Sequence, residues 1–215
     1  CAIGILTIIL SAGNAERDHL PLGEYYTLIL FAIVGMMLMA STTDLLVIFI
    51  ALEIMSLGVY VLTAIKRSSA EGAEASFKYF VLGAFSSAFF LYGIAMAYAV
   101  TGTTRLDEIG MRVASSALDP GILTILSMVL LLVGFAFKVG AVPFHMWTPD
   151  VYEGAPTPVT TFFATAPKVA ALALTMRVAL DAFGSQADAW RQIVIFTSLA
   201  SIVIGALGAI GQANI

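Results

Sequence analysis

Apolar runs of about 20 residues recur along this chain, and short polar turns separate them. A run of that length is what an α-helix needs to cross the hydrocarbon core of a bilayer. Of the 215 residues, 60% are hydrophobic and 11% are charged. A soluble domain usually carries about 25% charged residues. Too few polar side chains remain to cover a water-facing globule, so the sequence predicts an all-α, polytopic transmembrane helical bundle.

Six runs are long enough to span a membrane, and we expect helices at about 24–40, 45–65, 72–100, 121–140, 159–182 and 192–212. The apolar segment 1–10 is too short to span and is expected to form a partial helix before a polar stretch at 11–23. The connection 101–119 is expected to be an exposed loop with a short amphipathic piece. Asp44 or a neighbouring threonine can cap the helix that follows. Because residue 1 is not Met and the chain stops just past an apolar run, residues 1–215 are expected to be a fragment forming a single transmembrane domain.

Charge and cysteine content exclude several classes of function. The net charge is −4, and the ten lysines and arginines form no basic stripe, so nucleic-acid binding is not expected. Cys1 is the only cysteine, which excludes an internal disulfide framework and a cysteine metal cluster. Loop lysines and arginines divide evenly between the two sides, so the positive-inside rule gives no orientation.

Four ionisable residues interrupt the apolar runs: Glu53, Lys78, Lys138 and Lys168. A charge at bilayer depth costs from about 3 kcal/mol to above 10 kcal/mol, depending on the reference state. Such residues normally face a bundle interior or a water-filled path and serve a proton or ion relay. One acid and three bases fit a proton relay better than a pocket for a large substrate.

Three of these residues have a functional and a structural interpretation each. Nothing adjacent can pair with Glu53, so its partner must come from another helix, either to serve a relay or merely to bond that helix. Lys138 is near the end of its run, from which it could also extend to the interface. Lys168 follows Pro167, which kinks a helix and suits a hydrated cavity; the alternative is a lysine paired for packing alone.

The remaining candidates are more ambiguous. Lys78 is four residues after Glu74, and the two could form a simple interfacial ion pair. His145 can titrate near neutral pH and could join a relay, although in a loop it is more often structural. Asp150 and Glu153 could serve only to cap the next helix or to face water at the interface.

A proline-rich segment at 142–158 interrupts the helices close to Lys138. It contains four of the seven prolines, namely Pro143, Pro149, Pro156 and Pro158. A regular helix cannot continue through it, and the break could admit water and freed carbonyl groups around the lysine. Burial lowers the pKa of a lysine and a nearby carboxylate raises it, so a movable Glu–Lys pair could switch a lysine between holding and releasing a proton.

The residues around this break resemble a known family. Lys138, Pro143-Phe144-His145, Trp147 and Pro149-Asp150 are followed by Ala155-Pro156-Thr157-Pro158-Val159 and, thirty residues after Lys138, by Lys168. This pattern resembles the antiporter-like membrane subunits of respiratory complex I, which are relatives of Mrp-type cation/proton antiporter subunits. The segment 147–158, WTPDVYEGAPTP, resembles the subunit N family of the proton-pumping NADH:quinone oxidoreductase. The resemblance extends from about residue 24 to the end.

The resemblance implies an antiporter-like five-helix inverted-repeat fold with a discontinuous helix. Residues 24–182 would form the first repeat and 192–212 would open the second, whose remainder would lie outside this fragment. It also implies a proton relay of Glu53, Lys78, Lys138 and Lys168, with His145 as a possible member. Glu53 would pair with Lys138 and tune its pKa, and the proton would pass through waters from Lys138 toward Lys168.

The implied function is proton translocation by a membrane subunit of NADH:quinone oxidoreductase in the respiratory electron-transport chain. No cofactor or metal is expected in this chain; NADH, FMN, iron–sulfur clusters and quinone are expected in partner subunits. The expected partners are other complex I membrane subunits, including other antiporter-like subunits, together with the lipid bilayer and protons. The alanine-rich composition suggests a multi-pass protein of a bacterial inner membrane. The alternatives are an Mrp-type sodium/proton antiporter subunit, a relative in hydrogenase or photosynthetic complexes, and a non-conducting scaffold.

Overall fold

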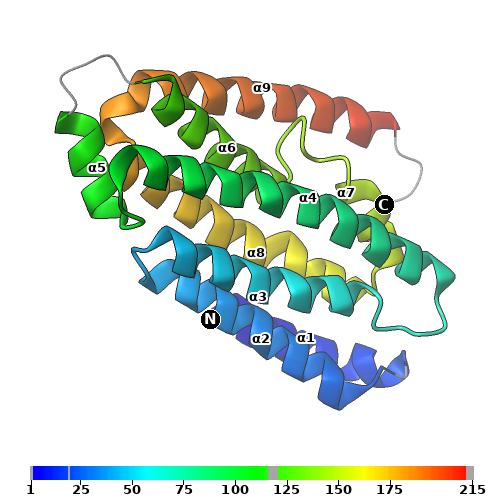
Figure 1. Cartoon of the computed structure of the whole chain (residues 1–215). Coiled ribbons are helices and arrows are strands. Elements are labelled where there is room, and N and C mark those ends of the chain that lie inside the picture. Colours follow the sequence, from blue (N-terminus) through cyan, green and yellow to red (C-terminus); the bar gives the residue numbers. More distant parts are fainter. Residues whose placement is uncertain (1, 19, 116–120, 212–215) are drawn as a thin grey trace.

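The computed structural model describes residues 2–18, 20–115 and 121–211, and helices account for most of them (Figure 1). In chain order the elements are α1 Ala2–Arg17, α2 Leu22–Ser41, α3 Leu45–Thr63, α4 Ala70–Thr101, α5 Leu106–Ser115, α6 Ile122–Val139, α7 Thr148–Gly154, α8 Thr157–Arg177, the π-helix η1 Val178–Ala182, the 3₁₀-helix η2 Gly184–Gln186 and α9 Ala187–Gly211. The described ranges contain no β-strand, only an isolated bridge between Asp44 and Arg105. The predicted all-α bundle is confirmed.

Six helical segments are long and apolar enough to cross a membrane, as the sequence predicts. They are Leu22–Ser41, Leu45–Thr63, Ala70–Thr101, Ile122–Val139, Thr157–Ala182 and Gly184–Gly211. The expectation of a helix confined to residues 1–10 was wrong, because α1 continues to Arg17. Small polar side chains do not end this helix, since they bond to its own backbone: Ser11 is buried and donates to the carbonyl oxygen of Ile8 at 3.1 Å.

The long helices lie side by side, and their connections gather at two ends of the bundle (Figure 1). We call these the α3–α4 end, where residues 64–69 join α3 to α4, and the α4–α5 end, where residues 102–105 join α4 to α5. The amphipathic helix α5 lies at the α4–α5 end, on the left in Figure 1. The short helix α7 packs against α4. The chain reverses direction between α6 and α8, in the proline-rich segment that contains α7 (Figure 1).

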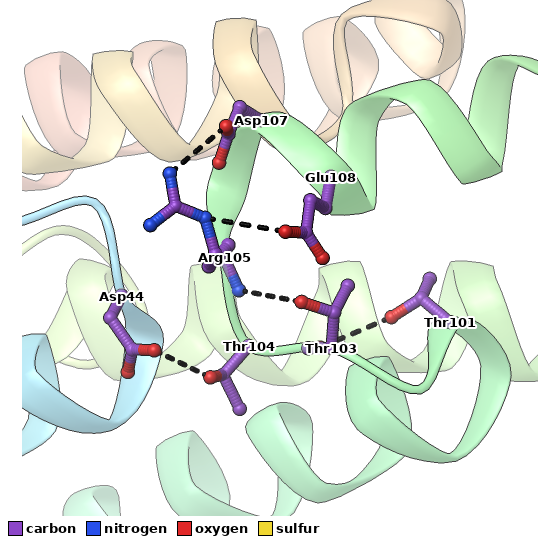
Figure 2. A network of polar contacts seen from close by, with 7 residues as sticks. All are labelled: Asp44, Thr101, Thr103, Thr104, Arg105, Asp107 and Glu108. Atoms are coloured by element: carbon purple, nitrogen blue, oxygen red, sulfur yellow. Dashed lines mark hydrogen bonds and ion pairs between the residues drawn. The ribbon is translucent and has the colours of Figure 1, made fainter.

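Asp44 links the start of α3 to the loop after α4 at the α4–α5 end (Figure 2). Its carboxylate accepts hydrogen bonds from the backbone N–H groups of Leu46 at 2.8 Å and Val47 at 3.3 Å, so it is the N-cap of α3. The Thr104 hydroxyl donates to the same carboxylate at 2.6 Å. The expected capping role is thus confirmed, and the cap also fixes two elements to each other.

Arg105 continues this polar network toward α5 (Figure 2). Its guanidinium forms ion pairs with Asp107 at 3.1 Å and Glu108 at 3.4 Å. Both acids are in the first turn of α5, where negative charge also complements the helix dipole. Helix α5 is the short amphipathic piece expected within 101–119, and residues 116–119 of that connection lie outside the described residues.

Glycines allow two helix pairs to approach closely. A Cβ atom on Gly35 of α2 would lie 2.6 Å from the Ala51 carbonyl oxygen of α3. A Cβ atom on Gly93 of α4 would lie 3.0 Å from the Leu131 backbone nitrogen of α6. Any larger residue at these positions would separate the helices. The close packing of α4 against α6 brings together two of the helices that carry the polar residues described next.

Large apolar side chains cover the outside of the bundle. They occur on every long helix, and α9 has no buried residue at all. Soluble monomers rarely expose contiguous apolar surface of this extent. These surfaces therefore suit contact with lipid tails or with further membrane helices.

Candidate functional site

Lys138 is the most deeply buried charged side chain of the described residues, with 6% of its surface exposed. It lies one residue before the end of α6, and its ammonium donates to the Ser56 hydroxyl at 2.8 Å and to the Tyr60 hydroxyl at 3.2 Å. The ammonium also lies over the rings of Tyr60 and Phe137, 5.6 and 5.8 Å from their centroids. Two hydroxyl acceptors and two π-faces stabilise a cation that burial would otherwise destabilise. Lys138 does not extend to the interface.

Glu53 is half-buried on α3, and its partner does come from another helix, as expected. Oε1 accepts a hydrogen bond from the hydroxyl of Ser87, on α4, at 2.5 Å. Across the described ranges no ion pair joins Glu53 to Lys138. Ser56 lies between them, because it is three residues after Glu53 and accepts the hydrogen bond from Lys138. The carboxylate and the ammonium are thus held by different hydroxyls, and Lys138 contacts the face of α3 that also carries Glu53.

Three phenylalanines form an apolar layer beside this polar group, on the side of the α4–α5 end. Phe49 precedes Glu53 by one turn, Phe90 follows Ser87 by one turn and Phe135 precedes Lys138 by one turn. The Phe90 ring centroid is 6.4 Å from that of Phe49 and 4.9 Å from that of Phe135. Phe90 and Phe135 are each 1% exposed. This phenylalanine layer closes the polar group toward the α4–α5 end.

The helix that carries Lys138 ends in an ordered break. Gly140 adopts a left-handed conformation with φ of 77°, which glycine reaches without strain. The N–H of Ala141 then donates to the carbonyl of Ala136 at 2.9 Å, closing the helix end. The Trp147 indole donates to the Phe137 carbonyl at 3.1 Å. The break predicted from the prolines is therefore present. Two carbonyl groups at the end of α6, those of Ala136 and Phe137, accept hydrogen bonds from residues of the break.

Lys168 lies on the far side of this break, on α8. Its ammonium is 5.2 Å from the centroid of the Tyr152 ring. A Cβ built on Gly140 would be 3.8 Å from the Lys168 ammonium nitrogen, so the lysine reaches the carboxyl end of α6. The negative end of a helix dipole and an aromatic face both favour a cation there.

Three polar atoms from the break are buried without a hydrogen-bond partner among the described residues. They are Nδ1 of His145, Oγ1 of Thr148 and the hydroxyl of Tyr152. A Cβ on Gly140 would also be 3.3 Å from the Thr148 oxygen, which places that atom near Lys168. Buried polar atoms with spare capacity can bond to water or to a moving ammonium. The structure thus brings the predicted His145 into the same break as Lys138 and Lys168.

Lys78 differs from the other lysines. Its side chain is 44% exposed and forms ion pairs with Glu74 at 2.8 Å and Asp150 at 2.6 Å. Together with Glu71 and Glu153, these residues line an open recess of about 190 Å³. The ion pair with Glu74 that the sequence allowed is therefore present, and Asp150 of α7 is a second partner. Lys78 is near the start of α4, where water reaches it.

Sequence reasoning missed the residues that hold the charges: Ser56, Tyr60, Ser87 and Tyr152. A weak signal was present for two of them. Ser56 and Tyr60 follow Glu53 by three and seven residues, which places all three on one helix face. Ser87 and Tyr152 belong to other elements, and only the packing of the helices identifies them.

Comparisons with known proteins agree with this architecture. Residues 41–215 match the family model described as NADH:quinone oxidoreductase/Mrp antiporter, TM. Proteins called NADH-quinone oxidoreductase subunit N are 57% identical over 214 residues in Erythrobacter litoralis and 58% identical over 192 residues in Sphingopyxis alaskensis. These alignments cover 100% and 89% of this chain but only 43% and 40% of the relatives, so the chain spans about two fifths of their length.

Solved structures give the same result. A chain of respiratory complex I from Thermus thermophilus is 43% identical, with a TM-score of 0.74, over 88% of this chain and 40% of that one. A chain of the Mrp complex from Dietzia is 26% identical, with a TM-score of 0.84, over 98% of this chain and 39% of that one. The residues matched by the family model, 41–215, include Glu53, Lys138 and Lys168.

Proposed function

Since this chain belongs to the transmembrane family shared by NADH:quinone oxidoreductase and Mrp antiporter subunits, we propose that it translocates protons within an NADH:quinone oxidoreductase. It is a multi-pass protein of a bacterial inner membrane. The observation that carries the proposal is Lys138, an ammonium buried in a membrane-spanning helix and held by the neutral hydroxyls of Ser56 and Tyr60, on the helix that also carries Glu53. Such a group can change its protonation state when the carboxylate moves.

The proposed relay uses Lys138 as the central proton carrier and Glu53 as the charge that tunes it. The proton passes next toward Lys168, through the break that contains His145, Thr148 and Tyr152. The unpartnered polar atoms of those three residues support this direction, since they can carry hydrogen bonds across the break. Residues of the longer protein would take the proton onward from Lys168.

Protons would enter from the α3–α4 end. The phenylalanine layer lies on the side of the other end, and its buried rings of Phe90 and Phe135 leave that side closed. At the α3–α4 end, the recess around Lys78 carries the acids Glu71, Glu74, Asp150 and Glu153. Their negative charge would raise the local concentration of protons. Lys78 would then act at the entrance and not inside the buried relay.

The redox chemistry would reside in partner subunits. Those subunits would bind NADH, FMN, iron–sulfur clusters and quinone, and this chain would contribute to the enzyme as its proton-translocating part. Its partners would be the other membrane subunits of the complex, including other antiporter-like subunits. Within the chain, residues 24–182 would be the first five-helix repeat, with 192–212 beginning the second. The helices at 22–182, with a break before α8, support this division.

A second candidate is an Mrp-type sodium/proton antiporter subunit. The match to the Mrp complex chain, with a TM-score of 0.84, favours it as the alternative. Sodium-dependent proton exchange in membranes that lack NADH oxidation would distinguish an antiporter from a redox-driven pump. The higher identity to the subunit N relatives favours the pump.

The test is NADH-driven proton uptake by inside-out membrane vesicles, recorded together with quinone reduction, for the full-length protein carrying Lys138→Ala. We expect both rates to fall strongly while the complex remains assembled on native gels. Lys66→Ala is the matched control, because Lys66 is an exposed loop lysine at the α3–α4 end. Normal rates in the Lys138→Ala vesicles would contradict the proposal.

A further inference from the structure

Ser87 holds the carboxylate of Glu53 in its present position. Its hydroxyl donates to Oε1 at 2.5 Å, from α4 to α3. Ser87 is buried, so water does not compete freely for this bond. A hydroxyl that donates to a carboxylate forms a charge-assisted hydrogen bond, which is stronger than a bond between neutral groups.

Lys138 contacts the same face of α3 that carries Glu53. The lysine is bonded to Ser56, which is three residues from Glu53 on the same face of α3. Glu53 thus bonds a donor on α4, and the helix face that carries it is contacted by a second donor, Lys138, on α6. Rotation of the Glu53 side chain would exchange one donor for the other.

We infer that Ser87 is a positioning residue that holds Glu53 away from Lys138 and so sets how readily the Glu53–Lys138 pair opens. The inference rests on the proposed relay. With Glu53 on Ser87, the Lys138 ammonium has the neutral hydroxyls of Ser56 and Tyr60 as its hydrogen-bond partners. With Glu53 on Lys138, a countercharge would face the ammonium and oppose transfer of its proton. Without the serine hydroxyl, the carboxylate would stay with the lysine and slow each proton transfer.

The chain offers a matched control one residue away. Ser86 is also buried on α4, but its hydroxyl has no hydrogen-bond partner within the described structure. Ser86→Ala therefore removes the same atom from the same helix without touching Glu53. Ser87→Thr keeps a hydroxyl at the inferred position and serves as the conservative variant.

The experiment uses the full-length protein in its assembled complex, in inside-out vesicles. Proton uptake and NADH oxidation are measured for Ser87→Ala, Ser87→Thr, Ser86→Ala, Glu53→Ala and the double variant Ser87→Ala/Glu53→Ala. We expect Ser87→Ala to lower proton uptake by about tenfold, the scale of one lost hydrogen bond to a charged group. Ser86→Ala and Ser87→Thr should stay close to wild type.

The double variant tests whether the serine acts through the glutamate. Ser87→Ala should have no further effect once Glu53 is alanine, because coupled residues are not additive. Infrared difference spectra of the same samples should show the carboxyl band of Glu53, identified by its loss in Glu53→Ala, shifted only in Ser87→Ala. A general packing defect would not shift that band selectively.

The outcomes separate this inference from the proposed function. Normal proton uptake in Glu53→Ala would overturn the relay itself, and the inference with it. Impaired uptake in Glu53→Ala but normal uptake and an unshifted band in Ser87→Ala would overturn only the role of Ser87. Equal losses in Ser86→Ala and Ser87→Ala would also overturn it, because packing alone would then explain both.

Discussion

The α-carbon of Gly83, on α4, faces the hydroxyl end of Tyr60, on α3, so closely that no Cβ atom could fit between them. The glycine thereby makes room for the hydroxyl that accepts a hydrogen bond from Lys138. One small residue on α4 thus determines the contact between a tyrosine and a lysine on two other helices.

Gly83→Ala should displace Tyr60 and remove one of the two hydroxyl partners of Lys138. Overpacking of a dense core costs about 1–3 kcal/mol, so we expect a lower Tm for the solubilised protein. Proton uptake should also fall. Gly23→Ala is the control, because a Cβ there meets no atom within 4 Å. Equal Tm values for the two variants would show that Tyr60 moves aside without cost.

Lys168→Arg should not support proton transfer. Arginine keeps the positive charge beside Tyr152 and the end of α6, but its guanidinium does not release a proton at physiological pH. We expect the variant to assemble normally and to lose proton uptake about as severely as Lys168→Ala. Full activity of Lys168→Arg would show that a fixed charge is sufficient at this position.

Lys78→Gln should impair proton uptake much less than Lys138→Gln. Lys78 is a half-exposed surface group that shares its ion pairs with Glu74 and Asp150, and salt and water screen such pairs. Its effect should also weaken as ionic strength rises, because its expected role is electrostatic. Rates of uptake at low and high salt would test both points. Equal losses of proton uptake in Lys78→Gln and Lys138→Gln would show that Lys78 acts within the relay and not at its entrance.

Asp44→Ala should destabilise the protein by about 1 kcal/mol through loss of the α3 cap. The carboxyl also gives this cap a pH dependence. Burial raises the pKa of Asp44, but the hydrogen bonds from Thr104, Val47 and Leu46 and the nearby Arg105 outweigh it, so the pKa lies below its usual value of 3.8.

A carboxyl whose pKa is lowered by folding contributes stability that is complete above its unfolded value and is lost as the pH falls through its folded value. The contribution of Asp44 should therefore be intact at neutral pH and disappear below about pH 4. Asp44→Asn keeps a cap acceptor without this titration. Thermal unfolding of the wild type and Asp44→Asn should differ less at low pH than at pH 7. A difference in Tm that is the same at low pH and at pH 7 would show that the geometry of the cap, and not the charge of Asp44, causes the change in stability.

The sequence alone determined the architecture, because each constraint was local. Length and apolarity predicted six spanning helices, since the bilayer leaves a backbone few other ways to satisfy its hydrogen bonds. Prolines 143–158 located the break after Lys138, since proline cannot continue a helix. The motif around Trp147 and Pro149 indicated the family. The same local pattern misjudged the length of α1, because polar side chains such as Ser11 bond to the helix backbone and do not end the helix.

Tertiary structure decided which groups meet. Glu53 and Lys138 are 85 positions apart, and nothing in the sequence shows that Ser87 and Ser56 hold them while a carboxylate–ammonium contact is absent from the described structure. A hydroxyl or an ammonium is satisfied by whichever acceptor lies within about 3 Å, and that choice depends on helix rotation and separation. Glycines such as Gly93 set that separation through backbone contacts with another helix. The sequence therefore identified the ionisable residues, whereas the packing of the helices determined their hydrogen-bond partners.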